Sequence, residues 1–242
     1  MDEMSAGDAA DASEPSGART IEVLIVDDHR VFGDAMCIAV NLQPDMTCRG
    51  AVTTAEEAIA LVAERCADVA LLDVSLPGMD GITAIGALRE CCPTVRTILL
   101  TADTRAETLL AAVEAGADGF LPKGFPFTRV LQAVRHVEHE LVAEPLSLNR
   151  AIREVTGGQQ RRIRPGDDGA GGLTEREFEI LVLLAEGLPV KQVAKRLDVS
   201  VNTCRGHVAA LLRKLEVHSQ LAAVVKAARL GMLPNLRGDP QL

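Results

Sequence analysis

Short apolar runs alternate with segments of helical periodicity between residues 21 and 141. The apolar runs, rich in aliphatic and β-branched residues, predict strands at residues 21–26, 46–52, 69–72, 95–100 and 118–121. Between them, apolar residues recur every three or four positions, which predicts helices at residues 31–42, 55–65, 81–90, 105–115 and 127–141. Because parallel strands need crossover connections, the alternation predicts a doubly wound α/β fold with a five-stranded parallel sheet. The nearly continuous apolar strands indicate burial on both faces of that sheet.

The pattern changes after residue 141 and becomes entirely helical from residue 173. Residues 146–155 predict a short helix, whereas the Gly-, Arg- and Asp-rich stretch 159–172 is typical of a linker. Thr174 and Glu177 have the spacing of a capping box at the start of a helix that ends at residue 185. Further helices are predicted at residues 190–197, 201–215 and 219–230, and the tight turn at residues 198–200 makes a helix-turn-helix.

These patterns divide the chain into two domains with flanking segments. We predict a disordered tail at 1–19, an α/β domain at 20–142, a linker at 143–172, a small all-α domain at 173–236 and a tail at 237–242. A chain of 242 residues with 48% hydrophobic and 24% charged residues has room and composition for two globular domains.

Composition also excludes several classes of protein. No apolar run approaches the roughly 20 residues of a membrane helix, and the acidic first twenty residues do not resemble a signal peptide. The six cysteines have no CxxC or CxxH spacing, so we expect reduced thiols in a cytoplasm, with neither a zinc site nor a disulfide framework. These residues are Cys37, Cys48, Cys66, Cys91, Cys92 and Cys204.

The net charge of −9 is unevenly distributed along the chain. Residues 1–172 carry −12 and residues 173–242 carry +3, and the stretch 190–214 contains six basic residues against one acidic residue. An acidic front and a locally basic back fit a phosphate- or metal-handling module joined to a nucleic-acid-binding one. Ordinary solvated charge is the alternative interpretation.

Polar side chains follow the predicted strands at the points where these end. Asp27 and Asp28 follow the first strand, Asp73 the third, Thr101 the fourth and Lys123 the fifth. Because the carboxyl ends of parallel strands meet at one edge, these side chains are expected to converge. Clustered carboxylates repel one another unless a cation lies among them, and their hard oxygens suit Mg²⁺. An aspartate between a divalent metal and a lysine is well placed to attack phosphorus.

Four motifs in this half of the chain resemble the receiver domains of bacterial two-component response regulators. They are IVDDH at 25–29, LLDVSLPGMDGI at 71–82, ILLTA at 98–102 and GFLPKG at 119–124. The resemblance covers residues 21–141 and implies a flavodoxin-like fold in which Asp73 accepts a phosphoryl group. It further implies that Asp28 ligates Mg²⁺ directly, that Asp27 does so mostly through water, and that the backbone carbonyl of Ser75 is a third protein ligand.

The same resemblance implies a switch around the acceptor. Thr101 and Lys123 would bind the phosphoryl oxygens. Phe120 occupies the position of an aromatic residue that turns inward when Thr101 moves toward the phosphate, although core packing alone would also explain an aromatic residue there.

The helix at 201–215 has two distinct faces. Its apolar stripe faces the core of its own domain and consists of Val201, Cys204, Val208, Leu211 and Leu215. The remaining positions and the preceding helix carry polar and basic residues, namely Lys191, Lys195, Arg196, Asn202, Thr203, Arg205, His207 and Arg213. Such a helix suits insertion into the major groove, with its basic neighbours on phosphates. A small bundle that only dimerises is the alternative.

Residues 173–217 resemble the DNA-binding domain of the NarL/LuxR class, and the order of the two domains is also that of the class. The resemblance implies DNA contacts from Lys191, Asn202, Thr203, Arg205, His207 and Arg213. Gln192, Gly206 and Ala209 depart from the class pattern, and the last two leave little side chain for base contacts.

The sequence therefore predicts a cytoplasmic, phosphorylation-controlled transcriptional regulator. We expect a sensor histidine kinase and double-stranded DNA as partners, Mg²⁺ as cofactor, and a homodimer on activation, without turnover of a separate substrate. An aspartate-nucleophile phosphatase is the enzyme alternative, but such enzymes need a second acid two residues after the nucleophile, where Ser75 stands. A receiver acting through protein contacts without phosphorylation is a third hypothesis.

Overall fold

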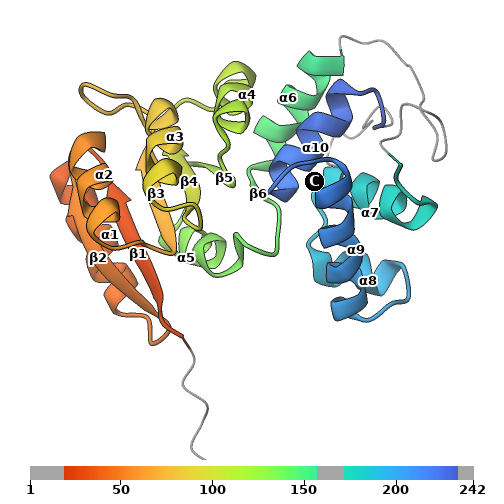
Figure 1. Ribbon diagram of the computed structural model, residues 1–242, viewed down its shortest axis with the longest axis horizontal. Helices are drawn as coiled ribbons and strands as arrows, with labels where there is room; N and C mark the ends of the chain where they lie inside the picture. The colour runs from red at the N-terminus through yellow and green to blue at the C-terminus, as the bar shows by residue number, and fades with distance from the viewer. Residues whose placement is uncertain (1–18, 157–171, 234–242) are drawn as a thin grey trace, which may run out of the picture.

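The computed structural model describes residues 19–156 and 172–233, and Figure 1 shows a sheet with its helices beside a second, helical unit. Within the described residues, six parallel strands form one sheet in the order β2-β1-β3-β4-β5-β6. The strands are β1 (Ile21–Val26), β2 (Met46–Val52), β3 (Val69–Asp73), β4 (Arg96–Thr101), β5 (Gly119–Pro122) and β6 (Val142–Ala143). The first five have the order 2-1-3-4-5 of flavodoxin-like folds, which confirms the predicted class.

Helices cover both faces of the sheet. They are α1 (Arg30–Asn41), α2 (Ala55–Glu64), α3 (Gly81–Cys91), α4 (Ala106–Ala115), α5 (Phe127–His136) and α6 (Pro145–Thr156). α1 and α5 pack on one face, and α2, α3 and α4 pack on the other. No helix in the described ranges is both long and apolar enough to cross a bilayer.

Strand β1 shows why the apolar runs are continuous. Val23 and Ile25 join the core under α1 and α5, whereas Leu24 and Val26 join the core on the opposite face. Because successive side chains of a strand point to opposite faces, a sheet covered on both sides needs apolar residues at every position.

The region after α5 differs from the sequence-based expectation. α5 ends at His136 rather than residue 141, and the chain then forms β6, which pairs with β5 through Gly119 and Val142. A side chain at Gly119 would meet this strand, because a Cβ there would lie 2.7 Å from Cγ1 of Val142. Residues 145–156, inside the expected linker, form the helix α6, which confirms the short helix predicted there and buries Leu148.

The structure does not describe most of the predicted tails and linker. Residues 1–18, 157–171 and 234–242, which include most of both predicted tails and of the glycine-rich linker, lie outside the described residues.

The second unit contains the four predicted helices, α7 (Glu175–Ala185), α8 (Val190–Arg196), α9 (Val201–Lys214) and α10 (Gln220–Arg229). The capping box is confirmed, since the Thr174 N–H donates to Glu177 and the Glu177 N–H donates to the Thr174 hydroxyl. Lys214 Nζ lies 2.6 Å from Glu177 Oε2 and so joins α9 to α7. Burial favours the protonated form of Glu177, but the hydrogen bonds from Lys214 and Thr174 outweigh it and keep its pKa below the ordinary value.

Helix α10 connects the two units because it packs against α4 and α6. Gln220 Nε2 donates to the carbonyl of His139 at 2.7 Å, and the Ser219 hydroxyl donates to the carbonyl of Ala117 at 3.4 Å. At the other end of the helix, Arg229 forms an ion pair with Glu114 of α4. The helical unit is therefore docked on the α4 side of the sheet.

The expectation of reduced cysteines is wrong for four of the six residues. The fold pairs Cys37 with Cys48 and Cys66 with Cys92 as disulfides, with Cα–Cα distances of 5.2 and 5.5 Å, whereas Cys91 and Cys204 are free. These pairs are separated by 11 and 26 residues in the chain. Spacing motifs in the sequence cannot reveal these disulfides, because tertiary packing brings the sulfurs together. α1 packs on β2 at the first pair, and the loop after α2 lies beside the loop after α3 at the second.

Two glycines of α3 give a matched test of how this helix packs on β3. A Cβ at Gly81 would lie 1.9 Å from the carbonyl oxygen of Asp73, whereas a Cβ at Gly86 would have no neighbour within 4 Å. Gly81→Ala should therefore destabilise the chain by about 1–3 kcal/mol, because the backbone after β3 must move. Gly86→Ala should stabilise it by about 0.5–1 kcal/mol through helix propensity. Urea denaturation followed by circular dichroism measures both, and equal effects of the two substitutions would contradict the packing of α3 on β3.

Candidate functional site

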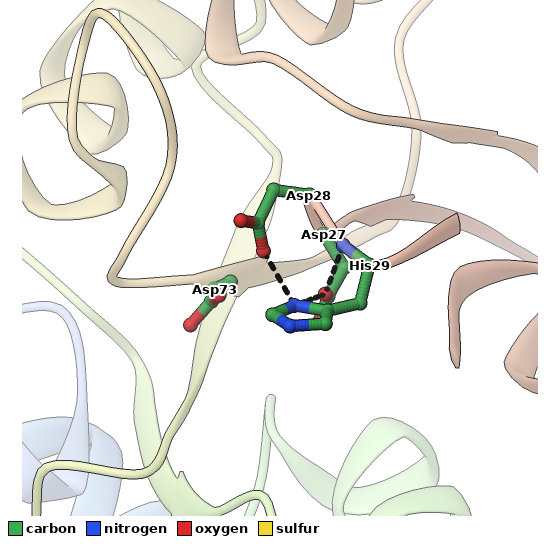
Figure 2. Close-up of side chains that lie close together, drawn as sticks. All are labelled: Asp27, Asp28, His29 and Asp73. Atoms are coloured by element: carbon green, nitrogen blue, oxygen red, sulfur yellow. Dashed lines mark hydrogen bonds and ion pairs between the residues drawn. The ribbon is translucent and has the colours of Figure 1, made fainter. Parts of the chain in front are cut away.

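An acidic cluster lies at the carboxyl edge of the sheet, where the sequence predicts it. Asp27, Asp28, His29 and Asp73 each place one potential ligand atom within 4.8 Å of the others. Figure 2 shows that Asp73 comes from a separate segment of the chain and lies beside the other three residues. The side chains of Asp27 and Asp73 are 2% and 4% exposed, and that of Asp28 is 39% exposed. Two buried carboxylates and one accessible carboxylate therefore meet at this edge.

Lys123 balances the two buried carboxylates. Its Nζ lies 2.8 Å from Asp27 Oδ2 and 2.7 Å from Asp73 Oδ2. Partial burial tends to lower the pKa of Lys123, but its hydrogen bonds with Asp27 and Asp73 outweigh burial and raise that pKa above the usual value. Nζ also lies 5.4 Å from the ring centroid of Phe32, at cation–π distance. The lysine is thus held charged beside the predicted acceptor.

His29 contributes to the cluster although the sequence analysis gave it no role. Its backbone N–H donates to Asp27 Oδ1 at 3.0 Å, and its ring Nδ1 lies 2.7 Å from Asp28 Oδ1. The residue orients both carboxylates from the start of α1. Its only signal in the sequence is its position directly after the paired aspartates.

Thr101 lies at the end of β4 and is 1% exposed. Its hydroxyl accepts a hydrogen bond from the Asp103 N–H at 2.9 Å. The Asp103 carboxylate in turn binds the Arg105 guanidinium and the Thr108 hydroxyl of α4, with Oδ2 2.7 Å from Thr108 Oγ1. The hydrogen bonds from Arg105 and Thr108 hold the pKa of Asp103 far below its usual range. Asp103, which the sequence analysis missed, thus connects Thr101 to α4.

Phe120 and Ser75 have very different environments. Phe120 is fully buried in the core on the α4 face of the sheet, together with Leu148 of α6. Its ring is therefore covered from solvent, and the predicted turn of this ring when Thr101 moves stays a prediction. Ser75 is exposed in the loop between β3 and α3, two residues after Asp73.

The carboxylates fit a divalent cation on chemical grounds. Asp27, Asp28 and Asp73 offer hard oxygen ligands close together, as Mg²⁺ prefers, and the accessible Asp28 leaves one side open to solvent. Lys123 compensates part of the negative charge of Asp27 and Asp73, so the cluster is stable before a cation binds.

The candidate DNA-binding face is α9 with the start of α8. The predicted apolar stripe is turned inward, since Cys204, Val208 and Leu211 are buried. The opposite side of α9 is accessible: Asn202, Thr203, Arg205 and Arg213 are exposed, as is Lys191 of α8, and His207 is half-buried. The Thr203 hydroxyl lies 2.8 Å from Ser200 Oγ, so it is engaged in capping α9.

Comparisons with known proteins match both halves of the chain. The family described as response regulator receiver domain matches residues 23–135, and the family described as bacterial regulatory proteins, luxR family, matches residues 172–227.

Individual proteins with a similar sequence or fold agree with these matches. The nitrate/nitrite response regulator protein NarL of Escherichia coli K12 is 31% identical over 204 residues, which are 84% of this chain and 93% of that protein. The nitrate/nitrite response regulator protein NarP of the same strain is 33% identical over 210 residues, which are 86% and 94% of the two chains. A LuxR-family two-component response regulator from Aurantimonas sp. SI85-9A1 is 26% identical with a TM-score of 0.52, over 56% of this chain and 97% of that one.

These matches cover the acidic edge of the sheet and the exposed face of α9 in the order that the class requires. The chain therefore belongs to the two-component response regulators that join a receiver domain to a LuxR-type DNA-binding domain.

Proposed function

We propose that Asp73 accepts a phosphoryl group from a sensor histidine kinase and that this transfer controls DNA binding by α9. The observation that carries the proposal is the position of Lys123 Nζ, 2.7 Å from Asp73 Oδ2 and 2.8 Å from Asp27 Oδ2 at the carboxyl edge of the sheet. A fixed cation beside a buried carboxylate is the arrangement that phosphoryl transfer to that carboxylate needs.

The transfer itself is a displacement at phosphorus. An Asp73 carboxylate oxygen attacks the phosphorus of a phosphohistidine, the P–O bond forms, and the P–N bond breaks with its electron pair leaving on the imidazole nitrogen. Lys123 neutralises the charge of the transferred group on one side. Asp27, Asp28, Asp73 and the Ser75 carbonyl would hold Mg²⁺, which would supply further positive charge to the phosphoryl oxygens.

The switch runs through Thr101. Its hydroxyl leaves the Asp103 N–H, 2.9 Å away in the present state, and binds a phosphoryl oxygen instead. Because the Asp103 carboxylate is bound to Arg105 and Thr108, this change acts on the start of α4. Phe120 is fully buried on the α4 face of the sheet, so the turn of its ring that we expect with this change takes place within the core.

Helix α4 then relays the change to the DNA-binding unit. Glu114 of α4 is ion-paired with Arg229 of α10, and the Ala117 carbonyl accepts from the Ser219 hydroxyl. Movement of α4 would weaken these contacts, free α10, and allow two copies to dimerise on adjacent half-sites of DNA.

The alternatives have less support. A phosphatase would need a second acid two residues after Asp73, where Ser75 is exposed, so we propose no turnover of a separate substrate. A receiver that works without phosphorylation would not need Lys123 paired with both buried carboxylates.

Asp73→Asn tests the acceptor. Amide and carboxylate are nearly isosteric, but only the carboxylate is a nucleophile, so acyl-phosphate formation should be abolished while the fold is retained. The measurement is intact mass spectrometry after incubation with a small phosphodonor and Mg²⁺. Asp34→Asn, an exposed aspartate of α1, is the control and should be phosphorylated normally. Acid-labile phosphate on the Asp73 variant at the wild-type level would contradict the assignment.

Asp28→Ala tests the metal site. The substitution removes the accessible carboxylate of the cluster but leaves the Lys123 pairs intact, so the chain should fold and lose Mg²⁺ affinity by roughly tenfold or more. Isothermal titration with Mg²⁺ measures this loss, and phosphorylation should fall with it. Unchanged affinity would exclude Asp28 as a ligand.

Arg205 and Lys191 should respond differently to substitution. Arg205 is exposed on the first turns of α9 and can reach a guanine edge, and the small Gly206 and Ala209 beside it make it the main source of base readout. Arg205→Ala should cost about 1–3 kcal/mol on the operator and much less on random DNA. Lys191→Ala at the start of α8 should weaken both DNAs alike and lower the salt slope by about one.

A salt titration of phosphorylated protein on both DNAs measures these differences. Equal losses for Arg205→Ala on operator and random DNA would show that Arg205 only contacts the backbone, and specificity would then come from DNA shape.

A further inference from the structure

The disulfide between Cys66 and Cys92 lies at the edge of the sheet opposite to Asp73. Cys66 follows α2 and precedes β3, and Cys92 caps the end of α3 before β4. Cys92 is fully buried, but Cys66 is exposed. Cys91, adjacent to Cys92 in the chain, is a free and exposed thiol. The bond is thus open to thiol reagents on one side, and a third sulfur lies close to it along the chain.

Two arginines on either side of Cys92 bind a buried carboxylate of the receiver, and one of them also contacts the DNA-binding unit. Arg89 Nη2 and Arg96 Nη1 lie 2.8 and 3.1 Å from the carboxylate of Asp118, whose side chain is completely buried. Arg96 Nη1 also donates to the carbonyl of His218 at 3.3 Å. The next residue, Ser219, donates to the carbonyl of Ala117. Arg89 near the end of α3 and Arg96 at the start of β4 therefore flank the turn that the disulfide ties to the loop after α2, and Arg96 contacts the segment before α10.

The other disulfide has no such connection. Cys37 and Cys48 join α1 to β2 and are both half-buried. Neither α1 nor β2 is among the elements that pack against α10, which are α4, α6, α7, α9 and β6 in the described chain. The Cys37–Cys48 disulfide therefore serves as an internal control for effects of reduction that do not involve the docking of α10.

We propose that Cys66 and Cys92 form a reversible thiol–disulfide modification site whose oxidation state adjusts the docking of α10 on the receiver. In the oxidised state the turn between α3 and β4 is fixed, Arg89 and Arg96 stay on Asp118, and Arg96 holds the carbonyl of His218. Reduction frees the end of α3 from the end of α2 and loosens this contact. The site is independent of phosphorylation at Asp73.

The chemistry requires a low-molecular-weight disulfide as oxidant and the corresponding thiol as reductant. The Cys66 thiolate attacks the small disulfide, an S–S bond to one half of it forms, and the other half leaves as a thiolate. The Cys92 thiolate then attacks the Cys66 sulfur and displaces the second thiolate. The two released thiolates take up the two protons lost by the cysteines, so that two electrons pass from the protein to the small disulfide. Reduction is the reverse sequence.

The test uses the full-length Cys37→Ser/Cys48→Ser variant, in which Cys66–Cys92 is the disulfide that remains and Cys91 and Cys204 stay free thiols. The protein is equilibrated with oxidised or with reduced glutathione, acid-quenched, alkylated under denaturing conditions and analysed by peptide mass spectrometry. We expect a linked Cys66–Cys92 peptide in the first sample and alkylated Cys66 and Cys92 in the second, with full reversal on exchange of the buffer. Fragmentation of the peptides distinguishes Cys92 from its neighbour Cys91, which is free in both samples. Alkylated Cys66 and Cys92 in oxidised glutathione, or a Cys66–Cys92 bond that survives excess reduced glutathione, would overturn the proposal.

Hydrogen–deuterium exchange on the same two samples, without any phosphodonor, tests the effect on docking. Exchange in residues 89–97 and 217–222 should be roughly threefold or more faster in the reduced sample, because their contacts open more often. The control is Cys66→Ser/Cys92→Ser, which retains Cys37–Cys48 and should show no difference between the two buffers in either segment. Wild-type protein, which needs no substitution to fold, should follow the first variant. Equal exchange rates in the oxidised and reduced samples would refute the link to docking.

Discussion

The ammonium group of Lys123 lies between two carboxylates that are both removed from water, and the proposed phosphoacceptor edge depends on that pairing. Asp27 and Asp73 come from different strands, β1 and β3, and their side chains are almost completely buried. Leaving either charge buried and unpaired would be strongly unfavourable, because desolvation of an ion costs far more than ordinary side-chain burial. The lysine therefore makes the acidic edge compatible with a folded sheet and places a positive charge beside Asp73.

The same edge is connected to the far side of the molecule through one helix. α4 is attached at its start to Thr101 through Asp103, and near its end to α10 through Glu114 and Arg229. Both ends of the helix thus contact elements that take part in the proposed function. A packed helix moves as a unit more easily than it bends, so a displacement of the start of α4 also displaces its end. This is the physical basis for linking phosphorylation to the DNA-binding unit.

In our proposals, two signals act on the contact between α10 and the receiver. The Arg229 end of α10 meets α4, which follows the loop after Thr101, whereas its Ser219 end lies beside Ala117 and the ion pairs of Asp118 with Arg89 and Arg96. Meanwhile the polar face of α9 stays exposed. The docked state therefore constrains the helix that joins the units rather than covering the residues proposed to contact DNA.

The sequence by itself determined the local elements and the face that each one buries. The apolar runs in β1, β3, β4 and β5 and the three-to-four periodicity of α9 encode burial directly, because side-chain direction repeats with a fixed period in strands and helices. The parallel sheet that this alternation requires was enough to predict that Asp27, Asp28, Asp73, Thr101 and Lys123 lie at one edge.

Only the tertiary structure decided which distant side chains meet. The pairing of Lys123 with both Asp27 and Asp73, the Asp103 link to α4, the strand β6, and the docking of α10 have no periodic signal. The clearest case is the cysteines, for which spacing favoured reduced thiols although the fold joins Cys37 to Cys48 and Cys66 to Cys92. Such contacts depend on how several elements pack at once. The periodicity of a segment predicts only which of its side chains are buried and does not predict which residues they contact.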